Sequence, residues 1–215
     1  MTWRLARTIA ASLVLLGASG CAGGGIVTRS PGPTATETGP SQPSSAIASS
    51  DLAAQKKAAG IADCPASDPS VPARADGLPD VTLPCLGGGR PVRLAGLRGQ
   101  PMIISVWAQW CGPCRAEAPY LSEVAARQPS DVAIMGVDFV DPRPDLAIEF
   151  ARLSGWKYPQ IQDLDKALGG TLQVSAPPQT IFIDAHGKIV YRHAGPLGSV
   201  AQLRDLGRQH LGVTL

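Results

Sequence analysis

Residues 101–114 read PMIISVWAQWCGPC and join an apolar run to two closely spaced cysteines. Residues 101–108 are almost entirely apolar, which is typical of a parallel strand that is covered on both faces. Residues 115–127 carry apolar side chains at helical spacing, so we expect a helix there. Cys111 and Cys114 therefore lie where a buried strand turns into a helix.

The position of Cys111 at the start of a helix predicts a reactive thiolate. The first turn of a helix presents unpaired N–H groups and the positive end of the helix dipole, and both stabilise negative charge. We therefore expect Cys111 to be the nucleophile. Cys114 lies one turn later and is expected to face inward as the resolving thiol, which attacks the mixed disulfide and releases the reduced partner. Pro113 stiffens the turn and lacks an N–H where none is needed.

A Cys-x-x-Cys spacing alone also occurs in zinc sites or by chance, whereas Trp-Cys-Gly-Pro-Cys after an apolar strand is far more specific. Residues 107–114, WAQWCGPC, resemble the thioredoxin superfamily, and most closely its exported TlpA/ResA/DsbE-like branch of redoxins. Pro119 lies eight residues after Cys111, where the active-site helix of that family is kinked. The resemblance extends over residues 78–215.

The resemblance implies an α/β domain with the thioredoxin fold, in which helices flank a central mixed β-sheet. It also implies a β-hairpin added at the N-terminal side and an insertion before the strand that a cis-proline opens. The activity that it implies is thiol–disulfide oxidoreduction by the cysteine pair, with no metal and no organic cofactor. We therefore expect an enzyme of this class.

A second stretch, SAPPQTIFID at residues 175–184, places two prolines before a β-rich run. By the resemblance, Pro178 is the cis-proline that faces the cysteine pair. The backbone of Pro177 would then pair with a substrate chain as a short added strand, and Trp110 would shield the Cys111 sulfur and contact the substrate. The doublet departs from the family pattern, which has a small or branched residue before the cis-proline, so an ordinary loop doublet is the alternative.

Glu117 follows Cys114 by three residues, so the two side chains can share one helix face. The branch that the chain resembles has a glutamate here that tunes the cysteine pair. A carboxylate at this place would serve as proton acceptor for Cys114 and would disfavour the Cys111 thiolate; a solvated helix glutamate is the alternative. Ser105 stands where cytoplasmic thioredoxins carry a buried aspartate, which argues against a general thioredoxin.

The chain contains five cysteines, at positions 21, 64, 85, 111 and 114. With Cys21 assigned to a lipid and Cys111 paired with Cys114, Cys64 and Cys85 remain as a predicted structural disulfide. Such a bond would close a loop of about 20 residues and stabilise the domain by ~3 kcal/mol. A second redox pair that exchanges with the first is the functional alternative, and a zinc site is a third.

The N-terminus has the pattern of a secretory signal, with two arginines, an apolar stretch at 8–16 and small residues before Cys21. The sequence LGASGC resembles a lipobox, although its alanine stands where leucine is preferred; ordinary secretion is the alternative. We therefore predict a lipoprotein signal peptide at 1–20, a disordered tether rich in Ala, Gly, Ser, Thr and Pro at 21–75, and a thioredoxin-like domain at 76–215. A short helix is compatible with residues 51–61.

The other expected elements follow the alternation of apolar runs and turn residues. They are a hairpin of residues 81–83 and 91–94, a strand at 131–140, a helix at 146–153, a strand and a short helix within 156–174, a strand at 188–193 and a helix at 200–210.

The formal net charge of +2 offers no electrostatic case for nucleic acid. The N-terminal signal places the protein outside the cytoplasm, held at the cell membrane by the lipid on Cys21, where paired cysteines persist. The Gly-Pro dipeptide between Cys111 and Cys114 favours a reductant. The resemblance implies disulfide-containing exported proteins as partners, among them apocytochrome c during cytochrome c maturation, with a membrane thiol-electron transporter as electron source. A disulfide-forming oxidase is the main alternative.

Three further functions fit the residues less well. A peroxidase would need a Pro-x-x-x-Thr-x-x-Cys setting, which Cys111 lacks. A copper-carrying assembly protein of the same fold would use Cys-x-x-x-Cys with a distal histidine, and the spacing here is one residue shorter. A binding module with a vestigial cysteine pair would leave the motif unexplained.

Overall fold

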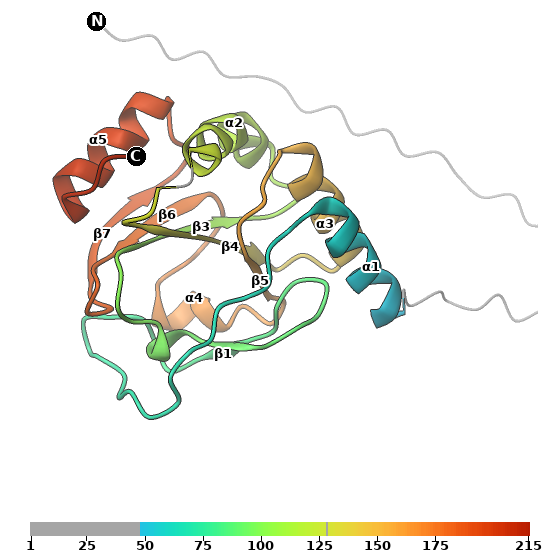
Figure 1. The fold of residues 1–215 in the computed structure, drawn as a ribbon, viewed down its shortest axis with the longest axis horizontal. Coiled ribbons are helices and arrows are strands. Elements are labelled where there is room, and N and C mark those ends of the chain that lie inside the picture. The colour runs from blue at the N-terminus through green and yellow to red at the C-terminus, as the bar shows by residue number, and fades with distance from the viewer. Residues whose placement is uncertain (1–47, 128) are drawn as a thin grey trace, which may run out of the picture. The chain divides into compact units, whose positions relative to one another are not determined.

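The computed structural model describes residues 48–127 and 129–215. Its centre is a five-stranded sheet in the order β5-β4-β3-β6-β7 (Figure 1). The strands are β3 (Met102–Trp107), β4 (Ala133–Phe139), β5 (Gln160–Asp163), β6 (Gln179–Ile183) and β7 (Ile189–Ala194). β3, β4 and β5 run parallel, whereas β6 pairs antiparallel with both β3 and β7. The predicted α/β class with a mixed central sheet is therefore confirmed.

Both faces of the sheet are covered, which explains the unbroken apolar run in β3. Ile103 and Trp107 point into the core under the helices on one face. Ile104 and Val106 point into a second core on the other face, together with residues of the hairpin. Because successive side chains of a strand alternate between faces, only a strand buried on both sides needs apolar residues at nearly every position.

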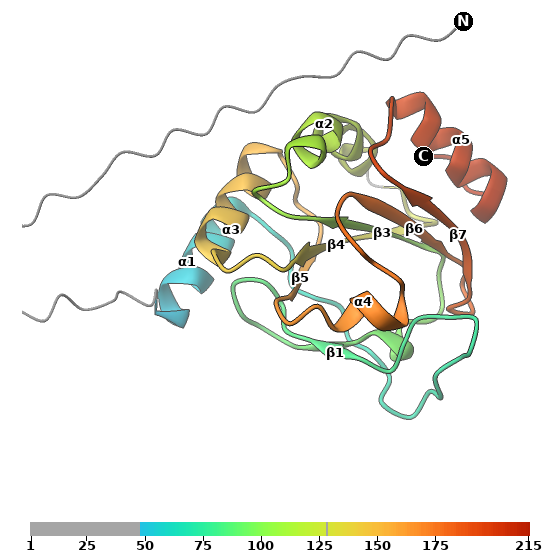
Figure 2. The same ribbon diagram turned by 180° about the vertical axis from the view of Figure 1, so that it is seen from behind.

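The helices divide between the two faces of the sheet. α2 (Gly112–Ala126) packs beside α5 (Val200–Leu211), and α3 (Pro144–Leu153) packs beside α1 (Ser49–Ala59). The short helix α4 (Ala167–Thr171) and strand β1 lie on the opposite side of the sheet from α2 in both views (Figures 1 and 2). None of the helices in the described parts of the chain is both long and apolar enough to cross a membrane.

The expected N-terminal hairpin is present. β1 (Thr82–Leu83) pairs antiparallel with β2 (Val92–Arg93), and a 3-10 turn, η1 (Leu94–Gly96), leads into β3. The predicted strand and short helix within residues 156–174 are β5 and α4.

The packed part of the chain begins at α1, ahead of the boundary predicted near residue 76. Ala59, Ile61 and Cys64 are buried, and a disulfide joins Cys64 to Cys85 as predicted. Residues 49–64 therefore belong to the folded unit rather than to the tether. The reason is that α1 packs against α3, and this tertiary contact stabilises a short helix. The predicted signal peptide, Cys21 and the tether up to residue 47 lie outside the described residues.

Lys56 explains how α1 is joined to the disulfide. This lysine is only 5 % exposed, and its ammonium contacts three groups. Its Nζ lies 3.1 Å from Asp63 Oδ1, 3.0 Å from Gly88 O and 3.1 Å from Cys85 Sγ. A buried ammonium is tolerated only when its donors have acceptors, and here all three do. The sequence-based predictions do not include this residue.

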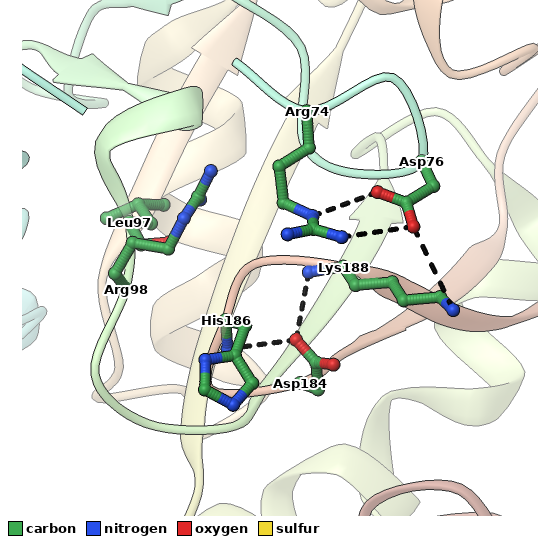
Figure 3. Close-up of polar contacts among 7 residues, drawn as sticks. All are labelled: Arg74, Asp76, Leu97, Arg98, Asp184, His186 and Lys188. Carbon is green, nitrogen blue, oxygen red and sulfur yellow. Dashed lines mark hydrogen bonds and ion pairs between the residues drawn. The ribbon is translucent and has the colours of Figure 1, made fainter. Parts of the chain in front are cut away.

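The turn between β6 and β7 is tied to the segment before β1 by polar groups (Figure 3). Asp184 Oδ1 accepts the N–H groups of His186 and Lys188, both at 2.9 Å, which shapes the turn. Asp76 pairs with Arg74 at 2.9 Å and with Lys188 at 3.8 Å. These ion pairs are exposed, so they contribute little to stability and mainly fix the path of the chain.

Candidate active site

Cys111 is the residue that opens helix α2. Its backbone is extended (φ −81°, ψ 106°), and its Sγ accepts a hydrogen bond from the N–H of Cys114 at 3.2 Å. The N–H of Cys111 donates to Ala108 O at 3.1 Å, which closes the turn between strand and helix. Because the N–H of Cys114 and the positive end of the helix dipole both face this sulfur, a thiolate here is stabilised.

The two cysteines are joined by a disulfide and differ in accessibility. Cys111 is 4 % exposed, whereas Cys114 is fully buried. The small difference in exposure is in the direction that the predicted roles require, with Cys111 as nucleophile and Cys114 as resolving thiol.

The two prolines lie at the same edge of the sheet as the cysteine motif. β6 begins at Gln179, which pairs with Val106 near the end of β3, so the residues just before Gln179 adjoin the strand end that leads to Cys111. The peptide bond between Pro177 and Pro178 is cis, as predicted. Pro178 is buried and its carbonyl accepts the N–H of Gly195 at 3.0 Å, whereas Pro177 is half-buried.

Trp110 provides the apolar surface next to Cys111. Its side chain is 52 % exposed, although apolar groups of this size usually gain from burial. Its indole Nε1 donates to Val140 O at 3.2 Å, so the ring is held by one polar contact while much of it faces solvent. Its predicted contact with substrate stays a prediction.

Glu117 is buried on the inner face of α2 and is not a solvated helix residue. It is 1 % exposed, and its Oε2 accepts the N–H of Leu197 at 2.7 Å. Its Oε1 has no hydrogen-bond partner among the described residues. Burial raises the pKa of Glu117 to about 7, although the N–H of Leu197 opposes that shift. A carboxyl that titrates near neutral pH therefore lies one helical turn after Cys114.

Buried hydrogen bonds hold the strand and the helix that carry the motif. Trp107 Nε1 donates to Gln160 Oε1 at 3.0 Å, and Trp156 Nε1 donates to Ala118 O on α2 at 3.2 Å. Gly136 of β4 leaves room for the first of these contacts, because a Cβ atom there would lie 1.8 Å from Gln160 Oε1. These contacts keep the motif's flanking elements in fixed positions.

Two buried carboxyls beside the motif are absent from the sequence-based predictions. Asp138 and Asp141 are both fully buried, and Asp141 accepts the backbone N–H of Gln109, two residues before Cys111. The signal for Asp138 is an aspartate inside the apolar run predicted as a strand at 131–140. A buried carboxyl in such a run must be paired or protonated, and the sequence alone does not identify which.

Within residues 48–127 and 129–215, no group of three or more His, Cys, Asp or Glu side chains is arranged to hold a metal ion. In the described structure all four cysteines, 64, 85, 111 and 114, are in disulfides.

Comparison with known proteins gives a family and several relatives. The family model described as Redoxin matches residues 73–206. The thiol:disulfide interchange protein DsbE of Pseudomonas fluorescens biotype C is 34% identical over 136 residues, which cover 62% of this chain and 73% of the relative. The protein of the same name from Escherichia coli (strain K12) is 39% identical over 101 residues, covering 46% of this chain and 52% of the relative. The match thus spans about half the length of the Escherichia coli protein.

Solved structures give the same fold. A secreted Mycobacterium tuberculosis disulfide oxidoreductase, described as homologous to Escherichia coli DsbE, is 27% identical and has a TM-score of 0.52. The match covers 60% of this chain and 93% of that one. A structure described as a thiol:disulfide interchange protein DsbE from Chlorobium tepidum is 26% identical, with a TM-score of 0.54 and coverage of 62% and 92%.

Proposed function

Because the chain belongs to the Redoxin family, we propose that this thiol–disulfide oxidoreductase reduces disulfides of exported proteins through Cys111 and Cys114. The observation that carries the proposal is the asymmetric cysteine pair. Cys111 opens α2 and is the one of the two that retains exposed surface, while Cys114 is buried behind it. This arrangement suits attack at one sulfur and release by the other.

The reaction proceeds in two exchange steps. In the reduced enzyme the Cys111 thiolate attacks one sulfur of the substrate disulfide, forms a mixed disulfide and expels the other substrate sulfur as a thiolate, which takes up a proton. Cys114 then loses its proton and attacks Cys111 Sγ, which releases the second substrate thiolate. Two electrons pass to the substrate, and the enzyme is left with the Cys111–Cys114 disulfide.

Glu117 is the candidate acceptor for the Cys114 proton. It lies three residues after Cys114 on α2, is buried and has one carboxylate oxygen with no partner among the described residues. With its pKa raised to about 7, it can hold or release a proton near neutral pH, which suits a general base.

The substrate chain is expected to lie between Trp110 and the proline doublet. The half-exposed indole offers apolar contact beside Cys111, and the backbone carbonyl of Pro177 offers a hydrogen-bond acceptor to an N–H of an extended peptide. A flexible or unfolded chain meets this requirement better than a folded one, because its cysteines can reach a strand edge.

The reducing direction is supported by the Gly-Pro dipeptide, which thioredoxin also has. The proposed setting is extracytoplasmic, with a lipid on Cys21 holding the protein at the membrane. A membrane thiol-electron transporter would supply the electrons, and apocytochrome c is a candidate substrate. Disulfide formation in exported proteins is the alternative direction.

The reduction potential of the Cys111–Cys114 pair tests the direction. The purified protein is equilibrated in dithiol buffers of known potential and then alkylated. The reduced fraction of each cysteine pair is measured from the masses of its alkylated peptides. A value near that of thioredoxin, about −270 mV, is expected for a reductant. A value near that of the strong oxidant DsbA, about −120 mV, would instead support the oxidase.

Replacement of Glu117 by glutamine is expected to change the pH dependence of both stability and exchange. The pKa of Glu117 is about 7 in the folded protein and 4.5 as its ordinary value, so the folded state retains a proton that the unfolded state loses. Stability therefore falls as the pH rises from about 4.5 to 7, and above that range burial of the charge costs about 3 kcal/mol. Glu117→Gln removes this cost, so the variant should be more stable than the wild type at pH 8 and similar at pH 4.

The same variant should also lose the inflection near pH 7 in the rate of mixed-disulfide resolution, because glutamine accepts no proton at that pH. Urea unfolding at several pH values and stopped-flow exchange measure the two effects. Glu149→Gln is the control, since Glu149 is an exposed partner of Arg152 on α3. An unchanged inflection in the Glu117 variant would remove Glu117 from the mechanism.

A further inference from the structure

Both residues that precede Cys111 are held by the loop that follows β4, residues 140–143. The backbone N–H of Gln109 donates to Asp141 Oδ2 at 2.9 Å, and Trp110 Nε1 donates to Val140 O at 3.2 Å. Val140 has φ 50°, a left-handed conformation that a β-branched residue seldom adopts. Such a conformation persists where the surrounding structure enforces it, as is common beside reactive groups.

Asp141 is the residue that connects this loop to the motif. It is fully buried, and both of its oxygens accept backbone N–H groups. Its Oδ2 accepts from Gln109, and its Oδ1 accepts from Arg143 at 3.0 Å. Each oxygen of Asp141 thus has its own backbone N–H partner, whereas an amide in its place would have only one acceptor oxygen.

Asp138 lies next to Asp141 and is also fully buried. Gln162 Nε2 links the two residues, since it lies 3.4 Å from Asp138 Oδ2 and donates to the backbone O of Asp141 at 3.2 Å. Burial, followed by the negative charge of Asp141 and a hydrogen bond to it, raises the pKa of Asp138 to about 9. At neutral pH Asp138 is therefore a neutral acid, whose proton is available for a hydrogen bond to the neighbouring Asp141.

The described part of the chain pairs no cation with either carboxyl. Asp138 pairs in register with Trp107 of β3 and Gln162 of β5, both of them neutral. Arg143, on the same loop, directs its guanidinium to Asp145 at 2.7 Å and has only a weaker electrostatic interaction with Asp141. If Asp138 ionised, its negative charge would therefore be repelled by the negative charge of Asp141. The position of Asp141 itself depends on its hydrogen bonds from the N–H groups of Gln109 and Arg143.

We propose that Asp138 and Asp141 are positioning residues for Cys111: the Asp141 carboxylate holds Gln109 in place, and the neutral Asp138 acid holds Asp141. Loss of the Asp138 proton places a second negative charge beside Asp141, drives the two side chains apart and weakens the contact that holds Gln109 before Trp110 and Cys111. This inference rests on the proposed exchange reaction at Cys111 and Cys114. It adds a second proton-dependent element beside Glu117, on the opposite flank of the motif.

The test compares Asp138→Asn, Asp141→Asn and the control Asp145→Asn with the wild type. The full-length proteins are assayed for reduction of insulin disulfides over a range of pH, and the amide resonance of Gln109 is followed by NMR over the same range. The side-chain amide of the Asp138→Asn variant keeps a donor toward Asp141 at every pH, because an amide does not titrate. The control breaks the exposed ion pair of the same loop and leaves Gln109 in place.

Three results are expected. In the wild type and in the control, the chemical shift of the Gln109 amide changes with pH around the pKa of Asp138. This pH-dependent change is absent from Asp138→Asn. The ratio of the Asp138→Asn rate to the wild-type rate rises at least about fivefold between neutral pH and about pH 10, as Asp138 ionises in the wild type. Asp141→Asn loses one of two N–H contacts, so its exchange rate and the hydrogen-exchange protection of Gln109 each fall about tenfold.

Two results would overturn the proposal. One is an alkaline transition of Gln109 and of the rate that persists in Asp138→Asn. The other is an Asp141→Asn protein with wild-type exchange and wild-type protection of Gln109. The NMR arm needs no substrate, so it tests the positioning even if the wild type reduces no protein disulfide, in which case the exchange reaction itself would be refuted. Asp138→Asn is isosteric with the neutral acid, so the test stands if Asp141→Asn does not fold.

Discussion

Replacing Cys111 by serine is expected to abolish disulfide reduction, because a hydroxyl at the start of α2 does not form a nucleophilic anion near neutral pH. Cys114→Ala should instead complete the first exchange step and stop there, since no second thiol is present to release the substrate. The purified Cys114→Ala protein should therefore accumulate as a mixed disulfide with a model substrate and with its natural partner. Non-reducing electrophoresis and mass analysis of the trapped species measure this outcome.

A matched control separates loss of the nucleophile from loss of a disulfide. The double variant Cys64→Ser, Cys85→Ser also removes one disulfide, but it leaves Cys111 and Cys114 unchanged, so it should retain exchange. If Cys114→Ala traps no partner while the wild type reduces it, Cys114 does not act as the resolving thiol. If Cys111→Ser keeps exchange activity, the reaction uses another cysteine.

The same double variant is expected to lower stability by about 3 kcal/mol, which corresponds to a fall in melting temperature of roughly 6 to 12 °C for a domain of this size. The bond joins residues 21 positions apart and pins α1 and the hairpin to the same place. The serine hydroxyl that replaces the Cys85 sulfur can still accept from the buried ammonium of Lys56, so the expected loss comes from the missing covalent bond. The effect is measured as the difference in melting temperature between the two oxidised proteins. Both cysteine pairs are disulfide-bonded in the wild type, and Cys111–Cys114 is disulfide-bonded in the variant.

The redox potential of Cys111–Cys114 should change little in this variant, because Cys64–Cys85 is expected to act structurally. The control is Cys111→Ser, Cys114→Ser, which removes a disulfide that closes a much shorter loop and should cost less stability. A melting temperature equal to the wild type would contradict the structural role. A large shift in the potential of the Cys111–Cys114 couple would mean that the second pair takes part in electron transfer.

Several features of the fold can be predicted from the sequence. β3 and the start of α2 are predictable because each leaves a local pattern, an apolar run and a Cys-x-x-Cys motif at a helix start. The cysteine count identifies the Cys64–Cys85 pair by elimination, and the structure contains that bond. The cis peptide before Pro178 comes from the family resemblance and is present as well.

The structure differs from the sequence-based prediction mainly in where the packed domain starts. Residues 49–64 resemble a polar linker in composition, yet they contain α1 and the buried Cys64. Lys56 is the least expected member, because lysine is almost never buried alone. Its burial depends on acceptors from Asp63, Gly88 and Cys85, which are brought together only when the hairpin folds over α1.

The α/β class, the family resemblance and both cysteine pairings could be predicted from the sequence, because these depend on residues that are close in the chain or on simple counts. The tertiary structure alone decided that Glu117 is buried with a raised pKa and that Asp138 and Asp141 share the environment of Gln109. The physical reason is that desolvation and charge–charge interaction depend on what surrounds a group in space. Leu197 lies 80 residues from Glu117, and Asp141 lies 32 from Gln109, so no local pattern reports these contacts.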